Sequence, residues 1–492
     1  MGILKKIRNF FKKEGEEMSE NQFFTQNTLM SLYDDFICSE KFLWFEIGEK
    51  YYKAENDILD RTMYSIQNGT KVIDTSQPNN KLNHNFTKCL VDQKVDYSLG
   101  KEPKITSDDE IYLDLLEEIL KDNKFNYKLN LVGKKASNNG ISWIHPYIDS
   151  KGKFKFMVVP ATQVIPIWAD DMESELNAAI RVYETVNTSL GYLEEFTVLE
   201  YWTKTGVTKY KLNGNQLMPL QDNDDLLSEL DGKQVGEIPH VVINREAKAW
   251  GIVPFIPFKN NMDMFPDIRY IKNLIDNYDL TRSDLANALE QLRNFILVLK
   301  NAQGSEIEEI IQNLKLYGII KTDNIDGSGS DVDMLSNPID ATASTTHTNL
   351  LKENIIELLQ GVNLNLDFKV PPSGVALQIL YSALDIKCNG FETELRQGFD
   401  LLQEFINLYL LETNQIKSKG NAEIQFQRNM PQNTTEAIQQ ARDSQGVISN
   451  KTIFEHHPFV KDADEEEKRF NKENQVYDNH FNNLTGLDGA NL

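Results

Sequence analysis

Apolar residues between positions 267 and 300 recur at multiples of three or four, the spacing that places side chains on one side of an α-helix. They are Ile268, Ile271, Ile275, Tyr278, Leu285, Leu289, Leu292, Ile296 and Leu299. Pro266 suits the first turn of such a helix, because its missing N–H needs no partner there. At about 1.5 Å per residue, the pattern predicts a helix roughly 50 Å long.

A second helix is predicted over residues 346–360. Thr345 or Thr346 can provide its N-cap, and Gly361 suits its C′ position. The segment between the two helices ends in a Gly- and Ser-rich run at 326–330, which indicates a turn or flexible loop. The sequence therefore predicts a projecting helical hairpin with a small module at its tip.

Residues 362–372 are predicted to be extended, because apolar and polar residues alternate there and two prolines end the segment. Ser373 can cap the helix that follows. Apolar residues of that helix step by three or four: Leu380, Leu384, Cys388, Phe391, Leu395, Phe399, Leu402 and Ile406. Its roughly 39 residues predict a length of about 58 Å, with Gly390 and Gly398 as candidate kink points.

Two helical patterns lie nearer the N-terminus. Residues 1–13 place lysine and arginine opposite an apolar side, which predicts a basic amphipathic helix. This helix either packs on the protein itself or docks on a membrane surface or partner. From 21 to 130 the pattern is mostly helical, and Asp108 and Asp109 are expected to cap a helix rather than to catalyse. The apolar residues of that helix are Ile111, Leu115 and Ile119.

Between 142 and 258 the hydrophobic period changes to two, which predicts β-strands. The dipeptide Asn213-Gly214 predicts a hairpin turn, because both residues tolerate positive φ. A short strand at 424–428 is followed by small helical segments and an acidic run at 464–467. The predicted fold class is therefore α+β and mainly helical.

Composition adds two constraints. The 492 residues carry a formal net charge of −23, which is poorly suited to gripping nucleic acid but does not prevent DNA from passing an acidic wall. Cys38, Cys89 and Cys388 form no CxxC pair, so neither disulfides nor a zinc site is expected, and synthesis in a reducing cytoplasm fits. No apolar run approaches the roughly 18 residues of a membrane span, so stable membrane insertion is not expected.

The motifs of common enzymes are missing. None of the Gly-Lys pairs is followed by Ser or Thr, as the phosphate-binding loop of an ATPase requires. His456-His457 lacks the i, i+4 partner of a zinc-binding helix. The Asp-rich loop 323–333 lacks the ligand spacing of an EF-hand, so a solvated loop is favoured over a calcium site. We therefore expect no catalytic residue, no metal and no cofactor.

Nine short segments, spread over nearly the whole chain, carry a resemblance to one family. They are NHNF at 83–86, VDQKVDYSLGKEP at 91–103, VP at 159–160, VIPI at 164–167, WGIVPF at 250–255, NN at 260–261, SGVAL at 373–377, QRNMP at 427–431 and ISNKT at 448–452. In this order, around the two-helix module, they resemble the portal proteins (head-to-tail connectors) of tailed phages, of the type found in long-tailed phages of Gram-positive hosts.

The resemblance implies a portal fold whose parts follow the chain. The ranges are 1–19 for a basic N-terminal arm, 20–258 for the wing, 259–300 for stem helix 1, 301–344 for a small α/β clip, 345–361 for stem helix 2, 362–373 for the tunnel loop, 374–420 for the long wing helix and 421–492 for the crown and C-terminal region. Twelve copies, the number that family members carry in the particle, would form a ring at one capsid vertex.

The resemblance also implies a function and partners. The ring would conduct double-stranded DNA during genome packaging, join head to tail and release the genome, without catalysis. Terminase and then connector (adaptor) proteins would dock on it, and it would contact capsid and scaffolding proteins. The protein would be made in the host cytoplasm and reside in the virion. A peripheral membrane or surface interaction protein and a DNA-processing enzyme remain the alternatives.

Three groups of candidate site residues follow from the resemblance. Asn363, Asn365, Asp367 and Lys369 would face DNA from the tunnel loop, where a ring of Lys369 side chains would form a basic collar. Ile275, Leu289, Leu292, Ile355 and Leu359 are expected to pack within the stem. Lys315, Tyr317 and Lys321 are the candidates for partner docking at the clip.

Overall fold

The computed structural model describes residues 24–187, 194–214, 216–220, 237–291, 296–300, 331–335, 341–363, 373–430, 434–460 and 462–485. The α-helices are α2 (Gln26–Ile37), α3 (Glu40–Tyr52), α4 (Phe86–Leu99), α5 (Glu110–Asp122), α6 (Phe125–Asn139), α8 (Lys272–Gln291), α10 (Ala341–Leu358), α11 (Gly374–Glu412), α12 (Thr434–Asp443), α13 (Asn450–His456) and α14 (Ala463–Thr485). Short 3-10 helices are η1 (Asp57–Asp60), η2 (Ala161–Gln163) and η3 (Asp267–Tyr270).

The strands pair antiparallel. They are β1 (Tyr64–Gln67), β2 (Thr70–Ile73), β3 (Lys104–Thr106), β4 (Ile141–Ile148), β5 (Phe154–Val159), β6 (Val164–Trp168), β7 (Leu176–Asn187), β8 (Glu194–Trp202), β9 (Val207–Asn213), β10 (Gln216–Pro219), β11 (Val241–Ile243), β12 (Glu246–Lys248), β13 (Ile256–Lys259), β14 (Ile296–Lys300), β15 (Asp331–Leu335) and β16 (Glu423–Gln425). The largest sheet has the order β10-β9-β8-β7-β6, and a second has the order β13-β4-β5. Two-stranded sheets are β1-β2, β11-β12, β14-β15 and β16-β3.

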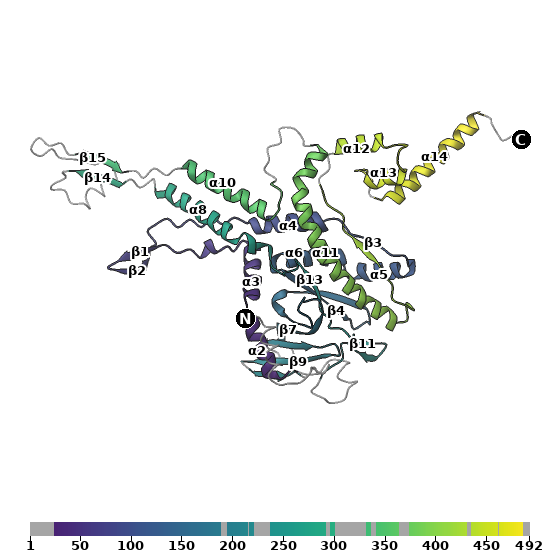
Figure 1. Cartoon of the computed structure of the whole chain (residues 1–492), viewed down its shortest axis with the longest axis horizontal. Helices are drawn as coiled ribbons and strands as arrows, with labels where there is room; N and C mark the ends of the chain where they lie inside the picture. Colours follow the sequence, from purple (N-terminus) through teal and green to yellow (C-terminus); the bar gives the residue numbers. More distant parts are fainter. Residues whose placement is uncertain are drawn as a thin grey trace, which may run out of the picture.

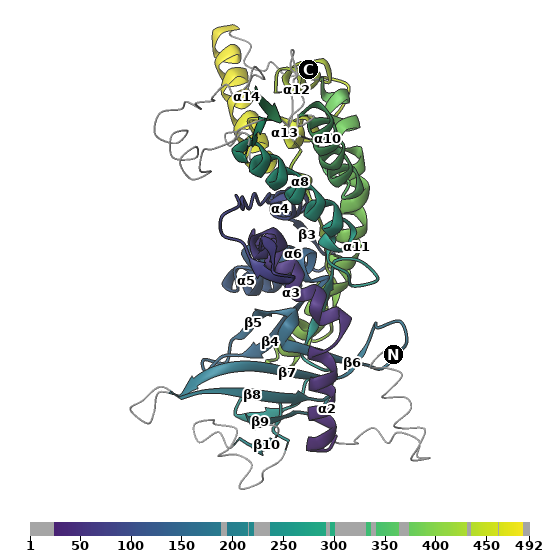
Figure 2. The same ribbon diagram turned by 90° about the vertical axis from the view of Figure 1, so that its left-hand side faces the viewer.

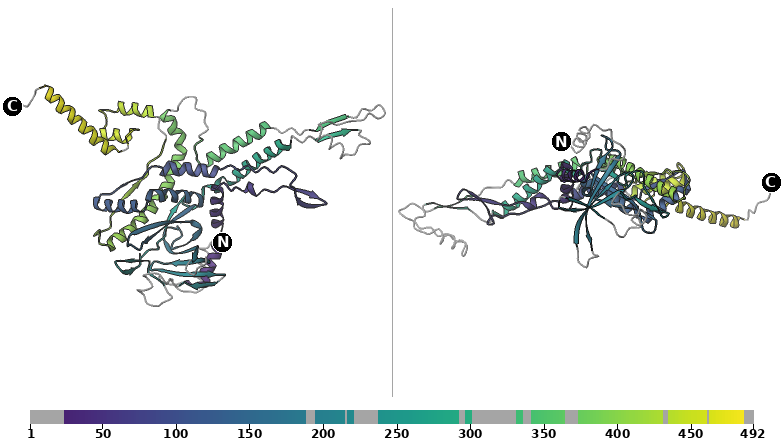
Figure 3. Two further views of the ribbon diagram at one scale, coloured as in Figure 1. Left: turned by 180° about the vertical axis from the view of Figure 1, so that it is seen from behind. Right: turned by 90° about the horizontal axis from the view of Figure 1, so that it is seen from below.

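The helices and sheets form a body with projections. In Figure 1, α8 and α10 run side by side away from the body and lead to β14 and β15, with β1 and β2 extending in the same direction. On the other side, α14 points away from the body. Figure 2 shows the β6–β10 sheet at one end of an elongated molecule, and Figure 3 shows from behind how α4 lies between the base of α10 and α11. The mixed α+β class predicted from the sequence is confirmed.

Two apolar cores hold the body together. One joins α11 to α4, α5, α6 and the β13-β4-β5 sheet, and its buried residues include Leu116, Phe258 and Phe399. The other packs α2 and α3 on the β6–β10 sheet, with Leu29 and Ile180 among its buried residues. Each large apolar side chain removed from water contributes about 1.5–3 kcal/mol, so the first core fixes the position of α11 in the body and the second holds α2 and α3 on the sheet.

The long helix predicted after Ser373 is confirmed. It spans Gly374–Glu412, 39 residues, and the Ser373 Oγ accepts a hydrogen bond from the Ala376 N–H at 3.3 Å. Gly398 has a packing role, because a Cβ added there would lie 2.6 Å from the nearest Phe258 ring atom. The glycine therefore lets α11 approach the β13-β4-β5 sheet closely.

The first helix of the projecting pair is shorter than predicted. It ends at Gln291, and residues Ile296–Lys300 form β14, which pairs with β15 in a register that sets Ile296 opposite Leu335. A short apolar run satisfies helical and strand spacing equally well. Here the pairing with β15 makes the segment a strand. The prediction of one helix from 267 to 300 was therefore wrong in its last part.

The second helix of the pair begins earlier and ends differently. It starts at Ala341 rather than Thr346. The left-handed residue after it is Gln360, with φ of 54°, and not the expected Gly361. Gly361 is needed for another reason, because a Cβ there would lie 2.4 Å from the Leu90 side chain in α4.

The strands predicted between 142 and 258 are confirmed, as is the turn at Asn213-Gly214. Gly214 has a φ of 59°, and β9 pairs with β10 across the turn. The same dipeptide, Asn68-Gly69, forms the turn between β1 and β2, a hairpin that the helical interpretation of 21–130 missed.

Two other expectations hold in part. Asp109 caps α5 by accepting a hydrogen bond from the Tyr112 N–H at 3.0 Å, but Ile111 is 72% exposed and the buried face is carried by Tyr112, Leu116 and Leu120. The strand expected at 424–428 is limited to β16, which pairs with β3. Across the described ranges, no helix has the length and apolar character that a bilayer crossing needs.

Candidate functional site

Residues from distant motif segments converge where α4, α10 and α11 meet. From the 91–103 segment, α4 contributes Gln93, Lys94 and Tyr97; the chain before η3 contributes Asn260; and the chain after β16 contributes Arg428. These residues surround the end of α10 and the first half of α11. The predicted tunnel loop leaves and re-enters the body here.

The start of the loop is clamped by one side chain. The Val362 N–H donates to Gln93 Oε1 at 2.7 Å, and Gln93 Nε2 donates to the Val362 carbonyl at 3.0 Å. The two bonds resemble strand pairing, with the side-chain amide in place of a second strand. Val362 is 5% exposed and packs in an apolar cluster that includes Tyr97 and Tyr381. The first loop residue therefore has a fixed position.

The end of the loop is held by α12. The Gly374 N–H, in the first turn of α11, donates to Glu436 Oε2 at 2.7 Å. A carboxylate at this place is favourable, because the N-terminus of a helix carries partial positive charge and unpaired N–H groups. Together with the Ser373 cap, this bond fixes the point where the chain re-enters the body.

A buried ion pair joins α4 to η3. Lys94 is 1% exposed and donates to Asp267 Oδ2 and to Asn260 Oδ1, each at 2.7 Å. Burial lowers the pKa of Lys94 to about 8, with Asp267 opposing that shift. Burial alone would raise the pKa of Asp267, but the charges of Lys387 and Lys94 hold it well below its usual range. Both partners of the pair are therefore charged at neutral pH.

Lys387 connects this pair to the projecting helices. From α11, its ammonium lies 3.3 Å from Asp267 Oδ2 and donates to the Leu359 carbonyl at 3.0 Å. Asp267 begins η3, which leads into α8, and Leu359 follows α10. One side chain of the long helix therefore contacts the base of both projecting helices.

Arg428 binds α11 over two turns. Its guanidinium contacts Asp385 at 3.2 Å, Asn389 at 2.5 Å and the buried Glu392. The spacing of these three residues, i, i+4 and i+7, places them on one face of the helix. The Tyr97 hydroxyl donates to Asp385 at 2.8 Å, so the same face also receives α4. The motif QRNMP therefore joins the C-terminal segment to the base of the loop.

Three of the predicted stem residues lie together at the base of α8 and α10. Ile275, Ile355 and Leu359 are buried in one cluster with Tyr51 from α3 and Leu90 from α4. This cluster packs the base of α8 and α10 on the body.

Leu289 does not join that cluster and is 55% exposed within the single chain. Asn363 is half-buried at the start of the loop. The remaining candidates lie outside the described residues: Leu292, Asn365, Asp367, Lys369, Lys315, Tyr317 and Lys321. The predicted N-terminal helix over 1–13 and most of the loop 323–333 lie outside them as well.

The sequence-based candidates did not include Gln93, Lys387, Arg428 or Glu436. A signal for the buried pair was present, since Lys94 stands four residues after Leu90 and next to Val95, on the apolar face of α4. No spacing rule names Asp267 as its partner, because the two residues are joined only by the tertiary fold.

The converging polar groups satisfy one another and hold a loop. Across the described ranges, no group of three or more His, Cys, Asp or Glu side chains could hold a metal ion. The fold and this site thus define a structural class of protein: a body with a projecting helix pair, and a loop anchored where the pair meets the long helix.

Comparison with known proteins identifies the family. Residues 45–480 match the family described as phage portal protein, SPP1 Gp6-like. The chain is 31% identical to the portal protein of Bacillus phage SPP1 over 450 residues. This aligned region covers 90% of this chain and 86% of that protein. It is 30% identical over 453 residues to the portal protein of Clostridium phage phiCD119, covering 89% and 95%. The chain belongs to the phage portal protein family, as its sequence pattern predicted.

Proposed function

We propose that this chain forms the ring through which phage DNA enters and leaves the capsid. The observation that carries the proposal is the anchored loop: Gln93 fixes its start at Val362 and Glu436 fixes its end at Gly374. Two fixed ends would hold such a loop at one level of a channel while DNA moves past it. Family membership supports the same role and favours it over a membrane-surface protein or a DNA-processing enzyme.

Each part of the chain takes a role in this proposal. The helices α8 and α10 form the stem, which crosses the capsid vertex. The segment between them, with β14 and β15 at its base, is the clip, where Lys315, Tyr317 and Lys321 would meet terminase and later the connector proteins. The loop 362–373 presents Asn363, Asn365, Asp367 and Lys369 to DNA. The helices after β16 form the crown inside the head, and the remaining body is the wing, which meets capsid and scaffolding proteins.

Electron microscopy of the purified chain tests the ring. Negative stain of the purified chain should show particles with a central hole. The ring in the assembled virion should contain twelve subunits. If only monomers or dimers form across a range of salt concentrations, the proposal fails.

A charge reversal tests the channel role of the loop. Lys369→Glu should reduce the yield of packaged DNA severalfold but leave ring assembly intact, because it replaces a basic collar with an acidic one in an already acidic tube. Lys151→Glu, at an exposed turn of the wing, is the matched control. Packaged DNA protected from nuclease is the measurement, and equal yields from both variants would contradict contact between the loop and DNA.

A further inference from the structure

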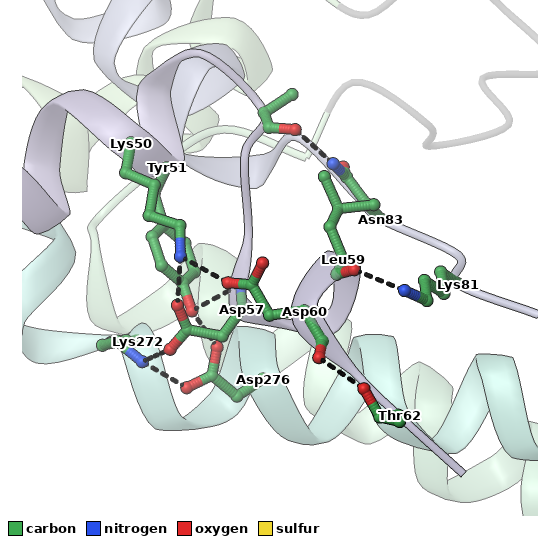
Figure 4. A network of polar contacts seen from close by, with 11 residues as sticks. Lys50, Tyr51, Asp57, Leu59, Asp60, Thr62, Lys81, Asn83, Lys272 and Asp276 are labelled. Atoms are coloured by element: carbon green, nitrogen blue, oxygen red, sulfur yellow. Dashed lines mark hydrogen bonds and ion pairs between the residues drawn. The ribbon is translucent and has the colours of Figure 1, made fainter. Parts of the chain in front are cut away.

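Charged side chains at the base of α8 satisfy one another. Figure 4 shows this cluster, in which Lys272 of α8 bonds to Asp57 at 2.6 Å and to Asp276 at 2.7 Å. Lys50 of α3 completes it by bonding to Asp57 and Asp60. A cluster between the two sheets of the body is different, because two of its largely buried polar side chains keep hydrogen-bonding groups that have no partner among the described residues.

A row of charged residues crosses three strands of the larger sheet. Arg181 of β7 stands directly opposite Glu200 of β8, which in turn stands opposite Lys209 of β9. Because side chains alternate along a strand, all three lie on the face that also carries Trp202. The neighbouring residue Ile180 points to the other face, which is buried against α2 and α3. One face of the sheet therefore builds the core, and the other presents charged groups beside an indole ring.

A cavity of about 220 Å³ lies over this row, between the two sheets. Its further lining comes from β4, β5 and the chain before β11, and includes His145, Tyr147, Met157 and residues 238–240. Figure 1 shows these strands in the lower part of the body. Tyr147 is 37% exposed, so the cavity reaches the surface. A cavity of about 150 Å³ can hold a benzene molecule, so this one has room for a substituted ring.

His145 contributes an unused acceptor to the cavity. It is 4% exposed, and its Nδ1–H donates to the Pro254 carbonyl at 2.6 Å. Burial lowers the pKa of His145 to about 3, so the ring is neutral near pH 7 and Nε2 is an acceptor. Across the described residues, no group donates to this nitrogen. The second histidine, His240, differs, because Trp250 N–H donates to its Nδ1 and its Nε2–H donates to the Thr203 carbonyl.

Arg181 contributes unused donors. Its Nη1 lies 3.8 Å from Glu200 Oε2, beyond hydrogen-bond distance, and its Nε is buried without a partner in the described part of the chain. The centre of the guanidinium lies 4.3 Å from the centroid of the Tyr183 ring. Glu200 accepts instead from the Tyr183 hydroxyl at 3.0 Å and from Trp202 Nε1 at 3.1 Å. The carboxylate is therefore satisfied, whereas the guanidinium is not.

The two unused groups select a neutral ligand that both donates and accepts. The carboxylate of Glu200 and the lone pair of His145 disfavour an anion, and the charge of Arg181 disfavours a cation. A hydroxyl group can donate to His145 Nε2 and accept from Arg181 at once. The two side chains are close enough that the charge of Arg181 helps to lower the pKa of His145. Trp202 and Met157 in the walls favour a hydroxyl that is carried on an aromatic ring.

We propose that this cavity binds the phenol group of a tyrosine side chain that a partner protein presents. The hydroxyl donates to His145 Nε2 and accepts from Arg181, and the ring packs on Trp202. The choice of a separate protein rests on the proposed function, in which this part of the body meets capsid and scaffolding proteins. Figure 2 shows the β6–β10 sheet at the end of the molecule away from α12 and α13.

Capped amino acids test the site on the full chain by saturation-transfer NMR of the ligand. N-acetyl-tyrosinamide should bind about tenfold more tightly than N-acetyl-phenylalaninamide, because a ligand without the hydroxyl leaves the polar groups of the site unpaired. N-acetyl-glutaminamide, which offers a carboxamide instead, should bind more weakly than the tyrosine compound. Arg181→Met should weaken tyrosine binding about tenfold and largely remove the preference over phenylalanine. Arg442→Met, at an exposed position of α12, is the matched control and should leave both dissociation constants unchanged.

Equal binding of the tyrosine and phenylalanine compounds, or tighter binding of the glutamine compound, would overturn the inference. Binding of p-cresol without binding of N-acetyl-tyrosinamide would do so too, because it would restrict the cavity to small phenols. Binding to single chains that is lost in assembled rings would assign the cavity to a neighbouring copy and overturn the separate partner.

The comparison of tyrosine with phenylalanine needs only the wild-type chain, so it remains decisive if Arg181→Met fails to fold. It is measured on single chains and therefore separates the two proposals. Absence of rings would overturn the proposed function, whereas loss of the tyrosine preference would overturn only this inference.

Discussion

Replacing Asp267 with asparagine isolates the buried charge of Lys94. The substitution keeps the size of the side chain but removes the carboxylate that lies 2.7 Å from the Lys94 ammonium. Removing one partner of a buried ion pair costs about 3–5 kcal/mol, because the other charge is left without compensation. Lys94 keeps one neutral acceptor, Asn260, at 2.7 Å, so we expect a loss near the lower end, about 3 kcal/mol.

The pH dependence of Asp267→Asn should identify the cause. In the native protein burial lowers the pKa of Lys94 to about 8, and Asp267 keeps it from falling further. Below pH 7 the lysine is therefore charged in both the folded and the unfolded state. Without Asp267 its folded-state pKa falls further, while the unfolded value stays near 10.4. A depressed pKa means that stability is lost as pH falls. The free energy of unfolding of the variant should therefore rise between pH 6 and 8 by up to about 1.4 kcal/mol per unit.

Hydrogen exchange of amides in α4 and α11 measures the effect, because their opening free energies report the packing around the pair. The double variant Lys94→Met, Asp267→Asn should lose less stability than the two single variants together, since no buried ammonium remains at position 94. Lys387 loses its contact with Asp267 in the single variant Asp267→Asn and in the double variant alike. Asp171→Asn, at an exposed position, should leave the exchange unchanged. A loss below about 1 kcal/mol, with the pH profile of the native protein, would refute the reasoning.

Two further predictions concern the body. Burial lowers the pKa of His145 to about 3 and that of His240 to about 4. Because unfolding lets both side chains bind protons near pH 6.5, these two groups should lower the free energy of unfolding by about 4 kcal/mol in total between pH 7.5 and 5. Urea titrations at several pH values test this, and the same change of the unfolding free energy with pH in the double variant His145→Gln, His240→Gln would contradict it. Gly398→Ala should destabilise by about 1–3 kcal/mol through its clash with Phe258, whereas Gly390→Ala, with no atom within 4 Å of the added Cβ, should be neutral or slightly stabilising in thermal unfolding.

Elements whose signals are local could be predicted closely. The start of the long helix α11 after Ser373 could be predicted because the cap and the first turn are neighbours in sequence, and its apolar spacing runs from Leu380 to Ile406. The turn at Asn213-Gly214 was evident for the same reason, since the conformation belongs to the dipeptide itself. The hairpin at Asn68-Gly69 carried the same signal but lay within a region whose overall spacing favoured helices.

Elements that depend on a partner could not be assigned from spacing. Residues Ile296–Lys300 fit a helix until β15 is found beside them. The anchoring site was partly visible as motif segments, yet the contacts of Arg428 with Asp385 and Glu392, and of Gln93 with Val362, join positions about 40 to 270 residues apart.

The sequence by itself determined the long helix α11, the pair of helices α8 and α10 and the membership of the portal family. The helices follow from caps and apolar periodicity, which are set by residues close together in the chain, and the family follows from motif segments spread along it. The tertiary structure alone decided that Lys94, Asp267 and Lys387 meet between α4, η3 and α11, and that residues 80–84 lie in register along α8. Such contacts form when packed elements bring distant polar groups together and exclude water, and periodicity carries no information about which groups will meet.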